Sequence, residues 1–112
     1  MTTKKVPEGY NTVTPYMVID NAAYGIDFLV KSFDAKEVHE RIMRDGKIGH
    51  AEVKIGNSII MITDSCEESK AMPSTFYIYT EDCDTLYKRA ITNGAKSLQE
   101  PVDQFYGDRS GG

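Results

Sequence analysis

The side chains that most clearly suggest acid–base chemistry in this sequence fall within residues 39–63. This stretch holds both histidines of the chain, His39 and His50, together with Arg41 and Glu52. A carboxylate and an imidazole held close together can transfer a proton, and a guanidinium can hold an anion. We therefore predict a small-molecule site in which Glu52 or His50 moves a proton and Arg41 binds an anionic group. The alternative for the same residues is a ladder of salt bridges across a solvated sheet face.

Two turn sequences predict the strands that carry these residues. Asp45-Gly46 separates the alternating runs 38–44 and 48–55, and Gly56-Asn57 separates the second run from 58–63. Asp-Gly is a strong hairpin signal, because both positions of the tight turn need a positive φ. Gly-Asn is a weaker signal for the same kind of turn. The sequence therefore predicts three antiparallel strands joined by two-residue loops.

Loops of two residues fix the register of these strands. The predicted pairs are Arg44 with Lys47, Ile42 with Gly49, Arg41 with His50, His39 with Glu52, Glu52 with Met61, Ala51 with Ile62, and His50 with Thr63. Alternation then gives an apolar face, suited to packing on a helix, that consists of Val38, Ile42, Ala51, Val53, Ile55, Ile60 and Ile62. The opposite face carries His39, Arg41, Met43, His50, Glu52, Lys54, Met61 and Thr63.

A strand-and-helix pattern occurs twice, at 14–36 and again at 75–96. Each copy opens with β-branched and aromatic residues, passes through an acidic turn and closes on Ala-Lys. Such repetition indicates two similar modules. We expect a single domain over 1–112, with module one at about 12–64, a linker at about 65–73 and module two at about 74–112. The second copy is followed by too few residues for three strands, so we expect its last strand or strands to be missing and the natural chain to continue past Gly112. The alternative is a partner that covers the gap.

Each copy also predicts one amphipathic helix. In the first, Asp20 or Asn21 is the expected N-cap and Asp34 the left-handed exit residue. The predicted apolar stripe consists of Ala23, Ile26, Val30 and Phe33, with Leu29 beside them. In the second copy, the stripe consists of Cys83, Leu86 and Ala90, with Ile91 beside them. The strand before that helix is expected to turn Phe76 and Ile78 under the helix and Tyr77 and Tyr79 to the other face.

Composition limits the class of protein. The chain has 112 residues, a net charge of -4, 40% hydrophobic residues and no basic run, which argues against nucleic acid or an anionic membrane as the main partner. No apolar stretch approaches the roughly 20 residues that span a bilayer, and the N-terminus lacks the apolar core of a secretory signal. Cys66 and Cys83 are expected to be reduced thiols in a cytoplasmic protein, with a disulfide or a catalytic thiol as the alternatives.

Several strings in the sequence resemble one superfamily. They are VTPYMVID at 13–20, GHAEVKIGNSIIMITD at 49–64, YTEDCD at 79–84 and QFYGDRSGG at 104–112. They are similar to the vicinal oxygen chelate superfamily, which includes glyoxalases, bleomycin resistance proteins and extradiol dioxygenases. Within it the chain most resembles the PhnB-like, demethylubiquinone methyltransferase-like proteins. The resemblance implies an α+β fold of two tandem βαβββ modules, with sheets that curl into a half-barrel, helices outside, and a homodimer.

The resemblance also indicates where a metal would bind. Metal enzymes of the superfamily use His on the first strand, Glu on the fourth, His on the fifth and Glu on the eighth. Carried over to this sequence, the first three positions fall at Val13, near Met61 and near Thr75, and the fourth lies beyond Gly112. None of these three side chains ligates a divalent cation as His or a carboxylate does. We therefore expect no metal and no other cofactor, and no glycine-rich loop suggests an adenosylmethionine site.

In the superfamily the concave side of the sheet lines a cavity, which implies that the polar face binds the ligand. Beside His50 and Glu52, the expected ligand-binding residues are His39, Arg41, Met61, Thr63, Tyr77, Tyr79, Tyr106, Asp108 and Arg109. Core packing is the alternative for the tyrosine wall, and an internal Asp108–Arg109 contact is the alternative for the last loop. We expect a protein that binds a small organic molecule without the usual metal. The alternative is a divalent-metal-dependent lyase, isomerase or hydrolase with a displaced site on His50 and Glu52.

Overall fold

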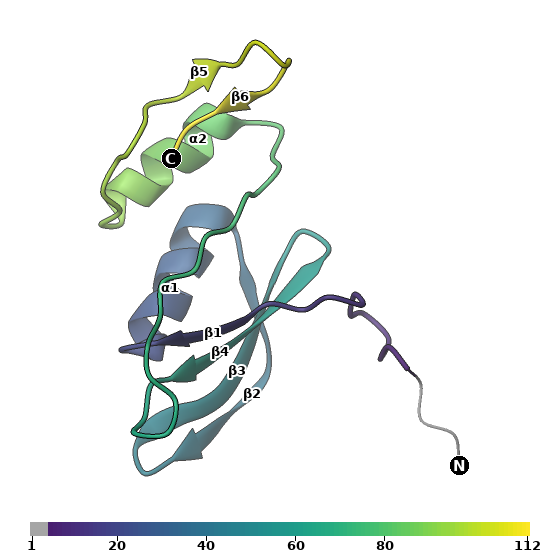
Figure 1. Ribbon diagram of the computed structural model, residues 1–112, viewed down its shortest axis with the longest axis vertical. Coiled ribbons are helices and arrows are strands. Elements are labelled where there is room, and N and C mark those ends of the chain that lie inside the picture. The colour runs from purple at the N-terminus through teal and green to yellow at the C-terminus, as the bar shows by residue number, and fades with distance from the viewer. Residues whose placement is uncertain (1–4) are drawn as a thin grey trace.

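The computed structural model describes residues 5–112, so residues 1–4 of the predicted domain lie outside the described part. In chain order the elements are β1 (Tyr16–Ile19), α1 (Ala22–Phe33), β2 (Lys36–Arg44), β3 (Lys47–Ile55), β4 (Ser58–Asp64), α2 (Cys83–Thr92), β5 (Val102–Asp103) and β6 (Arg109–Ser110) (Figure 1). The first five form one βαβββ module. Its sheet has the order β1-β4-β3-β2, with β1 parallel to β4 and the other neighbours antiparallel.

Local side-chain contacts set both ends of α1. Asn21 is the N-cap, and its side chain accepts a hydrogen bond from the backbone N–H of Tyr24 at 3.2 Å. The carboxylate of Asp64, at the end of β4, accepts from the N–H of Ala22 at 2.7 Å, which ties the start of the helix to the sheet. Asp34 ends the helix with φ 55. The predicted exit residue is thus confirmed, and Asn21 rather than Asp20 is the cap.

The face of α1 that packs on the sheet differs in phase from the predicted stripe. The helix buries Ala22 and Ile26, whereas Ala23 and Val30 are exposed. Both stripes share Ile26 and have helical spacing, so the sequence alone does not separate them. The bond from Ala22 to the end of β4 turns the first residue of the helix toward the sheet. The core that results consists of Ala22, Ile26, Ala35, Ile48, Ala51, Val53, Ile60 and Ile62.

The predicted register is right on one side of β3 and wrong on the other. Between β3 and β4, Glu52 pairs with Met61 and Ala51 with Ile62, as predicted. Between β2 and β3, Arg44 pairs with Lys47 as predicted, but Ile42 pairs with His50 and Val38 with Glu52. The predicted pairs Ile42–Gly49, Arg41–His50 and His39–Glu52 are therefore wrong.

Two irregularities in the β2–β3 ladder cause this change. On β3, Gly49 is an extra residue between the pairs that Ile48 and His50 make. On β2, three residues lie between Val38 and Ile42 opposite one residue of β3, and His39 among them has φ 63. Such bulges bend a strand and re-aim its side chains. As a result Ile42, predicted to be in the apolar face, is 60% exposed.

The second copy of the repeat forms its helix but not its strand. Asp82 caps α2 by accepting from the N–H of Thr85 at 3.1 Å. Residues 75–80 have strand-forming side chains but pair with no strand in the described part of the chain. In the first copy, β1 is held by β4, and the second copy has no equivalent of β4 within residues 5–112.

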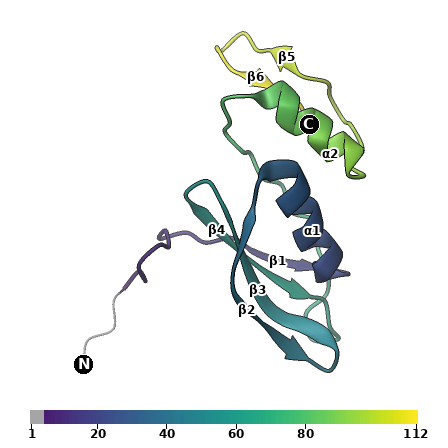
Figure 2. The same ribbon diagram turned by 180° about the vertical axis from the view of Figure 1, so that it is seen from behind.

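The two halves of the molecule also differ in layering. Here α2 packs against α1, and the β5–β6 hairpin lies beyond α2, at the far end from the four-stranded sheet (Figures 1 and 2). The expected half-barrel of curled sheets is not seen in residues 5–112.

No helix in this described part is long and apolar enough to cross a membrane. Cys66 and Cys83 are free thiols.

Candidate functional site

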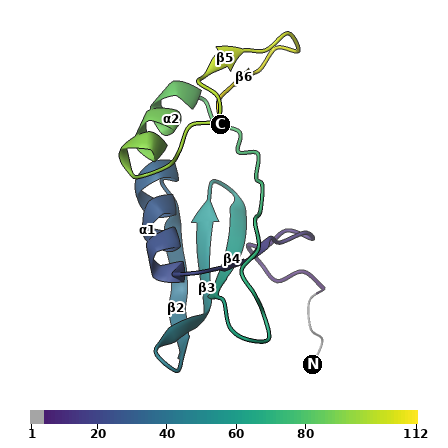
Figure 3. The ribbon, with the colours of Figure 1, turned by 60° about the vertical axis from the view of Figure 1, so that its left-hand side comes forward.

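One face of the four-stranded sheet is turned away from α1 and carries polar side chains. Strand β3 turns His50 and Glu52 to this face, because they alternate with Ala51 and Val53, which lie in the core. Residues 5–15, which we call the N-terminal arm, lie on the same side, with α1 on the opposite side of the sheet (Figure 3). The arm thus approaches the face that sequence alternation predicts to be polar.

Glu52 is the centre of a hydrogen-bonded cluster on this face. Its Oε1 accepts a hydrogen bond from the hydroxyl of Tyr10, and its Oε2 lies 2.7 Å from Nε2 of His50. The Tyr10 hydroxyl is also 3.3 Å from Nε2 of His39, which in turn lies 3.9 Å from Glu52 Oε1. We call Tyr10, His39, His50 and Glu52 the Glu52 cluster. It joins the N-terminal arm to β2 and β3.

The cluster favours an ionised Glu52. Burial alone would raise the pKa of Glu52, which is only 8% exposed. Hydrogen bonds from Tyr10 and His50, with the charges of His50 and His39, outweigh burial and leave the pKa below its ordinary value. The hydrogen bond to Glu52 is the main cause that raises the pKa of Tyr10, because ionising the phenol would place a second negative charge beside the carboxylate. Tyr10 therefore stays a proton donor.

A cleft of about 410 Å³ lies beside the cluster. The N-terminal arm forms most of its wall, including Tyr10, and Met61 of β4 forms part of the opposite side. Met61 pairs with Tyr16 of β1, whose ring centre lies 6.1 Å from that of His50. The cleft thus brings apolar and aromatic surface next to a polar cluster, a combination typical of small-molecule sites.

Two residues predicted for this patch lie outside the Glu52 cluster. Arg41 binds Glu37 on its own strand, with Nε–Oε2 and Nη2–Oε1 distances of 2.7 and 3.1 Å. The bulge in β2 breaks the predicted pairing of Arg41 with His50, and the guanidinium already has a carboxylate partner. Thr63 is buried and donates to the backbone oxygens of Ile48 and Asp64, at 3.2 Å each. Its contacts are structural.

Tyr10 is the residue of this cluster that sequence reasoning missed. It precedes the first strand, in a polar segment that holds Pro7 and Gly9, and it meets Glu52 across 42 positions of sequence. No periodicity links an arm to a sheet, so only a three-dimensional contact identifies it. The one available signal is an isolated aromatic residue in an otherwise polar arm.

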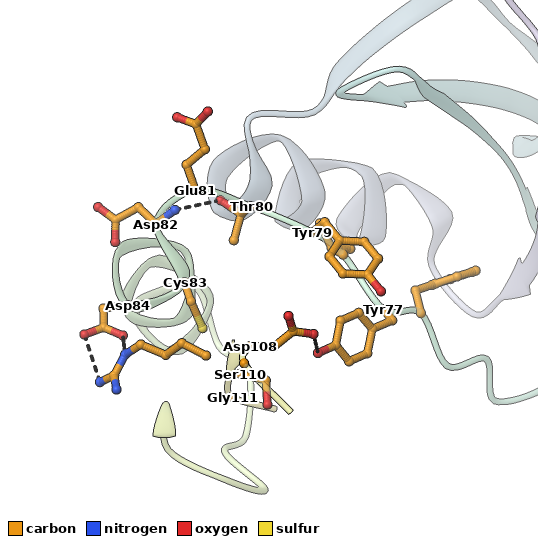
Figure 4. A pocket seen from close by; sticks show the side chains of 14 residues that line it. Tyr77, Tyr79, Thr80, Glu81, Asp82, Cys83, Asp84, Asp108, Ser110 and Gly111 are labelled. Atoms are coloured by element: carbon orange, nitrogen blue, oxygen red, sulfur yellow. Dashed lines mark hydrogen bonds and ion pairs between the residues drawn. The ribbon is translucent and has the colours of Figure 1, made fainter. Parts of the chain in front are cut away.

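Four of the other predicted residues, Tyr77, Tyr79, Asp108 and Arg109, line a second cleft, of about 500 Å³, formed by residues 76–84 and 107–111. We call it the C-terminal cleft (Figure 4). The hydroxyl of Tyr77 lies 3.5 Å from Oδ2 of Asp108, and the rings of Tyr77 and Tyr79 are 5.1 Å apart. Tyr79 is 82% exposed, so it is not packed in a core. The C-terminal cleft shares no lining residue with the cleft beside the Glu52 cluster.

Arg109, which lines the C-terminal cleft, forms ion pairs with α2 and β5. Its Nε and Nη2 bind the two oxygens of Asp84, at 2.7 and 3.2 Å, and its Nη1 binds Asp103 at 3.2 Å. These hydrogen bonds raise the pKa of the Arg109 guanidinium above its already high value. The partners are thus Asp84 of α2 and Asp103 of β5, not the neighbouring Asp108. Tyr106 is 56% exposed and packs edge-on against Phe105.

The expected metal positions of the superfamily carry no ligand side chain here. Val13 precedes β1 and is 81% exposed, and Thr75 lies in the unpaired segment. Within residues 5–112, no group of three or more His, Cys, Asp or Glu side chains could hold a metal ion. In the Glu52 cluster the carboxylate oxygens face Tyr10 and His50 rather than a shared point between three donors.

Comparison with known proteins decides the family. The model of the Glyoxalase/Bleomycin resistance protein/Dioxygenase superfamily matches residues 10–111. The chain belongs to this superfamily. An uncharacterised protein of Mycobacterium bovis is 34% identical over 110 residues, covering 88% of this chain and 72% of that protein. An uncharacterised protein of Mycobacterium tuberculosis is also 34% identical over 88% of this chain. The chain spans 65% of that second relative's length.

Several solved structures share the fold of the chain. TioX from Micromonospora sp. ML1 superposes with a TM-score of 0.68 at 21% identity, covering 88% of this chain and 85% of TioX. A superfamily member from Sphaerobacter thermophilus gives 0.64 at 14% identity, covering 88% and 82%. A PhnB protein from Bacillus cereus gives 0.62 at 18% identity, covering 88% and 87%. At these identities the likeness concerns the fold alone.

Proposed function

We propose that this superfamily member binds a small organic molecule at the Glu52 cluster, on the sheet face turned away from α1. The observation that carries the proposal is a nearly buried, ionised carboxylate that shares hydrogen bonds with a tyrosine and a histidine beside a cleft. Burying a carboxylate is costly unless it is paired. A titratable group with a perturbed pKa in a cleft is a sound candidate for function.

The salt-bridge alternative fits a different pair on the same sheet. Arg41 and Glu37 form an ion pair within β2 with partly exposed side chains, which is the arrangement expected of a surface salt bridge. Glu52 has no Lys or Arg partner among the ion pairs of the described residues; its partners are Tyr10 and the two histidines. A phenol or an imidazole lacks the permanent charge of a guanidinium, so a ligand group can replace it at lower cost. Glu52 is therefore better suited to recognition than to a surface ion pair.

The His50–Glu52 pair also supports proton transfer to or from a bound molecule. An ionised Glu52 accepts from Nε2 of His50, and in the tautomer that carries its proton on Nε2 the ring has a lone pair on Nδ1. A ligand proton placed within hydrogen-bond reach of Nδ1 would have a base ready to accept it. The divalent-metal alternative on His50 and Glu52 gains no support from the donor arrangement of the described residues.

A ligand screen tests the proposed site. Uncharged aromatic and aliphatic compounds are tested by thermal shift and by NMR against the wild type, Glu52→Gln and His50→Asn. Binders are expected to lose affinity in both variants by about tenfold or more, the size of one lost charge-assisted hydrogen bond. Glu67→Gln, at an exposed position outside the cluster and both clefts, is the matched control. Binding that survives both cluster variants, or that Tyr77→Ala alone abolishes, would refute this site and favour the C-terminal cleft.

The proposal includes a homodimer. Its support is the apolar surface that the bulges leave on β2, where Ile42 is 60% and Met43 is 55% exposed on an edge strand. Exposed apolar side chains on an unpaired strand edge favour association. Sedimentation of the wild type is expected to show a dimer that Ile42→Lys shifts toward monomer. A wild type that remains monomeric at high concentration would refute the dimer and leave the ligand site untouched.

A further inference from the structure

Tyr10 reaches the Glu52 cluster from an arm that has few other fixed contacts. The arm contains one tight turn, in which the N–H of Tyr10 donates to the oxygen of Pro7 at 3.1 Å, and Gly9 there has φ 87. Residues 5–15 form no strand pairing. The arm joins the sheet at Pro15, whose backbone oxygen accepts from the N–H of Met61 at 2.9 Å. The Tyr10 side chain is therefore the main attachment of the arm beyond that point.

The position of the Tyr10 hydroxyl suits a group that both donates and accepts. Its single proton goes to Glu52, so its oxygen is left to accept from Nε2 of His39. An ammonium group could donate to Glu52 but could not accept from His39. A carboxylate could accept but would be repelled by the ionised Glu52. A hydroxyl meets both requirements with one atom.

The surroundings add a requirement for a flat, apolar body. The cleft beside Tyr10 is bounded by Met61, and the Tyr16 ring lies near that of His50. Thioether and aromatic surfaces pack well against an aromatic ring. Together with the hydroxyl requirement, these nearby surfaces favour a ring that carries a hydroxyl group. Tyr10 itself supplies that chemistry from within the chain.

We propose that Tyr10 is an internal stand-in for the ligand, and that the ligand of the Glu52 cluster is an uncharged phenol that displaces it. This inference rests on the proposed ligand site and names its chemical class. The arm then acts as a tethered competitor, because a short tether gives Tyr10 an effective concentration of about millimolar. An incoming phenol takes the hydrogen bonds to Glu52 and His39, and the Tyr10 side chain turns away from Glu52 while the rest of the arm still forms the wall of the cleft.

The experiment uses p-cresol, which is the side chain of tyrosine as a free molecule. Its binding to the 112-residue chain is followed by NMR through the backbone amides of Glu52 and Met61. In Tyr10→Ala the affinity for p-cresol is expected to rise roughly 10–100-fold over the wild type, because the competing hydroxyl is gone. Tyr10→Phe, which keeps the ring and the fold of the arm, is expected to give a smaller rise. Tyr24→Ala, at an exposed tyrosine of α1, is expected to match the wild type.

Two comparison compounds make the test specific. Toluene lacks the hydroxyl and p-toluate carries a negative charge, so both are expected to bind Tyr10→Ala at least about tenfold more weakly than p-cresol. Equal p-cresol affinity in the wild type and both Tyr10 variants would overturn the inference, and so would toluene that binds as tightly as p-cresol. A compound from the ligand screen that binds the wild type and Tyr10→Ala equally would overturn the role of Tyr10 and leave the site standing. If no compound binds either protein, both proposals fall.

Discussion

The Tyr10–Glu52 hydrogen bond predicts a coupling energy that depends on pH in a defined way. The perturbations are Tyr10→Phe, which removes only the hydroxyl, Glu52→Met, which replaces the carboxylate by an apolar chain of similar length, and the double variant. A hydrogen bond to a charged group contributes about 1.5–3 kcal/mol to the free energy of unfolding. The conformational entropy lost when the Tyr10 side chain is ordered offsets roughly 1 kcal/mol of this. We therefore expect a coupling free energy of about 0.5–2 kcal/mol at pH 7.

The sign of the pH dependence follows from the two pKa shifts. The pKa of Glu52 is lowered in the folded protein, so its contribution is complete above the ordinary value of 4.5 and is lost as the pH falls through the folded-state pKa. The pKa of Tyr10 is raised, so its contribution is complete below the ordinary value of 10.0 and is lost as the pH rises through the folded-state pKa. The coupling is thus expected to be level between these limits and to decline on both sides.

Urea unfolding followed by circular dichroism measures this coupling, which suits a chain without tryptophan. The matched control is the cycle of Tyr24→Phe with Glu52→Met, because Tyr24 lies on α1 and is 61% exposed. Its coupling is expected to stay within about 0.3–0.5 kcal/mol of zero. A Tyr10 coupling inside that range at pH 7, or one that grows as the pH falls to 3, would refute the assignment of a hydrogen bond to an ionised Glu52.

Three further predictions concern the fold around the site. Asp64→Asn should destabilise the protein by about 1–2 kcal/mol in urea unfolding, because its two oxygens accept from the N–H groups of Ala22 and Ile48 at 2.7 Å each and an amide offers one acceptor. Ile62→Ala should lower the free energy of unfolding in urea by about 2–5 kcal/mol, because this side chain is fully buried between the sheet and α1. A decrease below about 1 kcal/mol would contradict that packing. Arg109→Met should speed hydrogen exchange in the β5–β6 hairpin and leave the four-stranded sheet unchanged, because its guanidinium joins that hairpin to α2.

The parts of the fold that the sequence predicts are those set by local chemistry. The Gly56-Asn57 turn and strict alternation gave the β3–β4 register, and Asn21 and Asp34 have the side chains that helix ends need. The β2–β3 register failed because its bulges depend on how the strand bends over the sheet, and neither His39 nor its neighbours signal a positive φ. Local sequence specifies a turn well and a bulge poorly.

The strand expected at residues 75–80 shows a second limit. Its side chains are those of a strand, but a strand exists only when another strand accepts its backbone hydrogen bonds. In the first module β4 does so for β1, and no described residue does so for 75–80. Tyr10 was missed for a related reason: Glu52, His50 and His39 are close together as expected, but Tyr10 comes from a segment with no periodic pattern.

The resemblance places the superfamily's carboxylate ligand near Met61, and the acid of this chain lies one strand away. Met61 and Glu52 are directly paired across β3 and β4, so their Cβ atoms lie about 4.5–5.5 Å apart on the same face. The resemblance thus implies that this is the face the superfamily uses, whereas the side chains on it differ from the superfamily's ligands. A thioether occupies the expected ligand position, and the neighbouring carboxylate is held by a phenol and an imidazole. Fold membership alone would have suggested chelation, whereas these side chains favour recognition of a hydroxyl group.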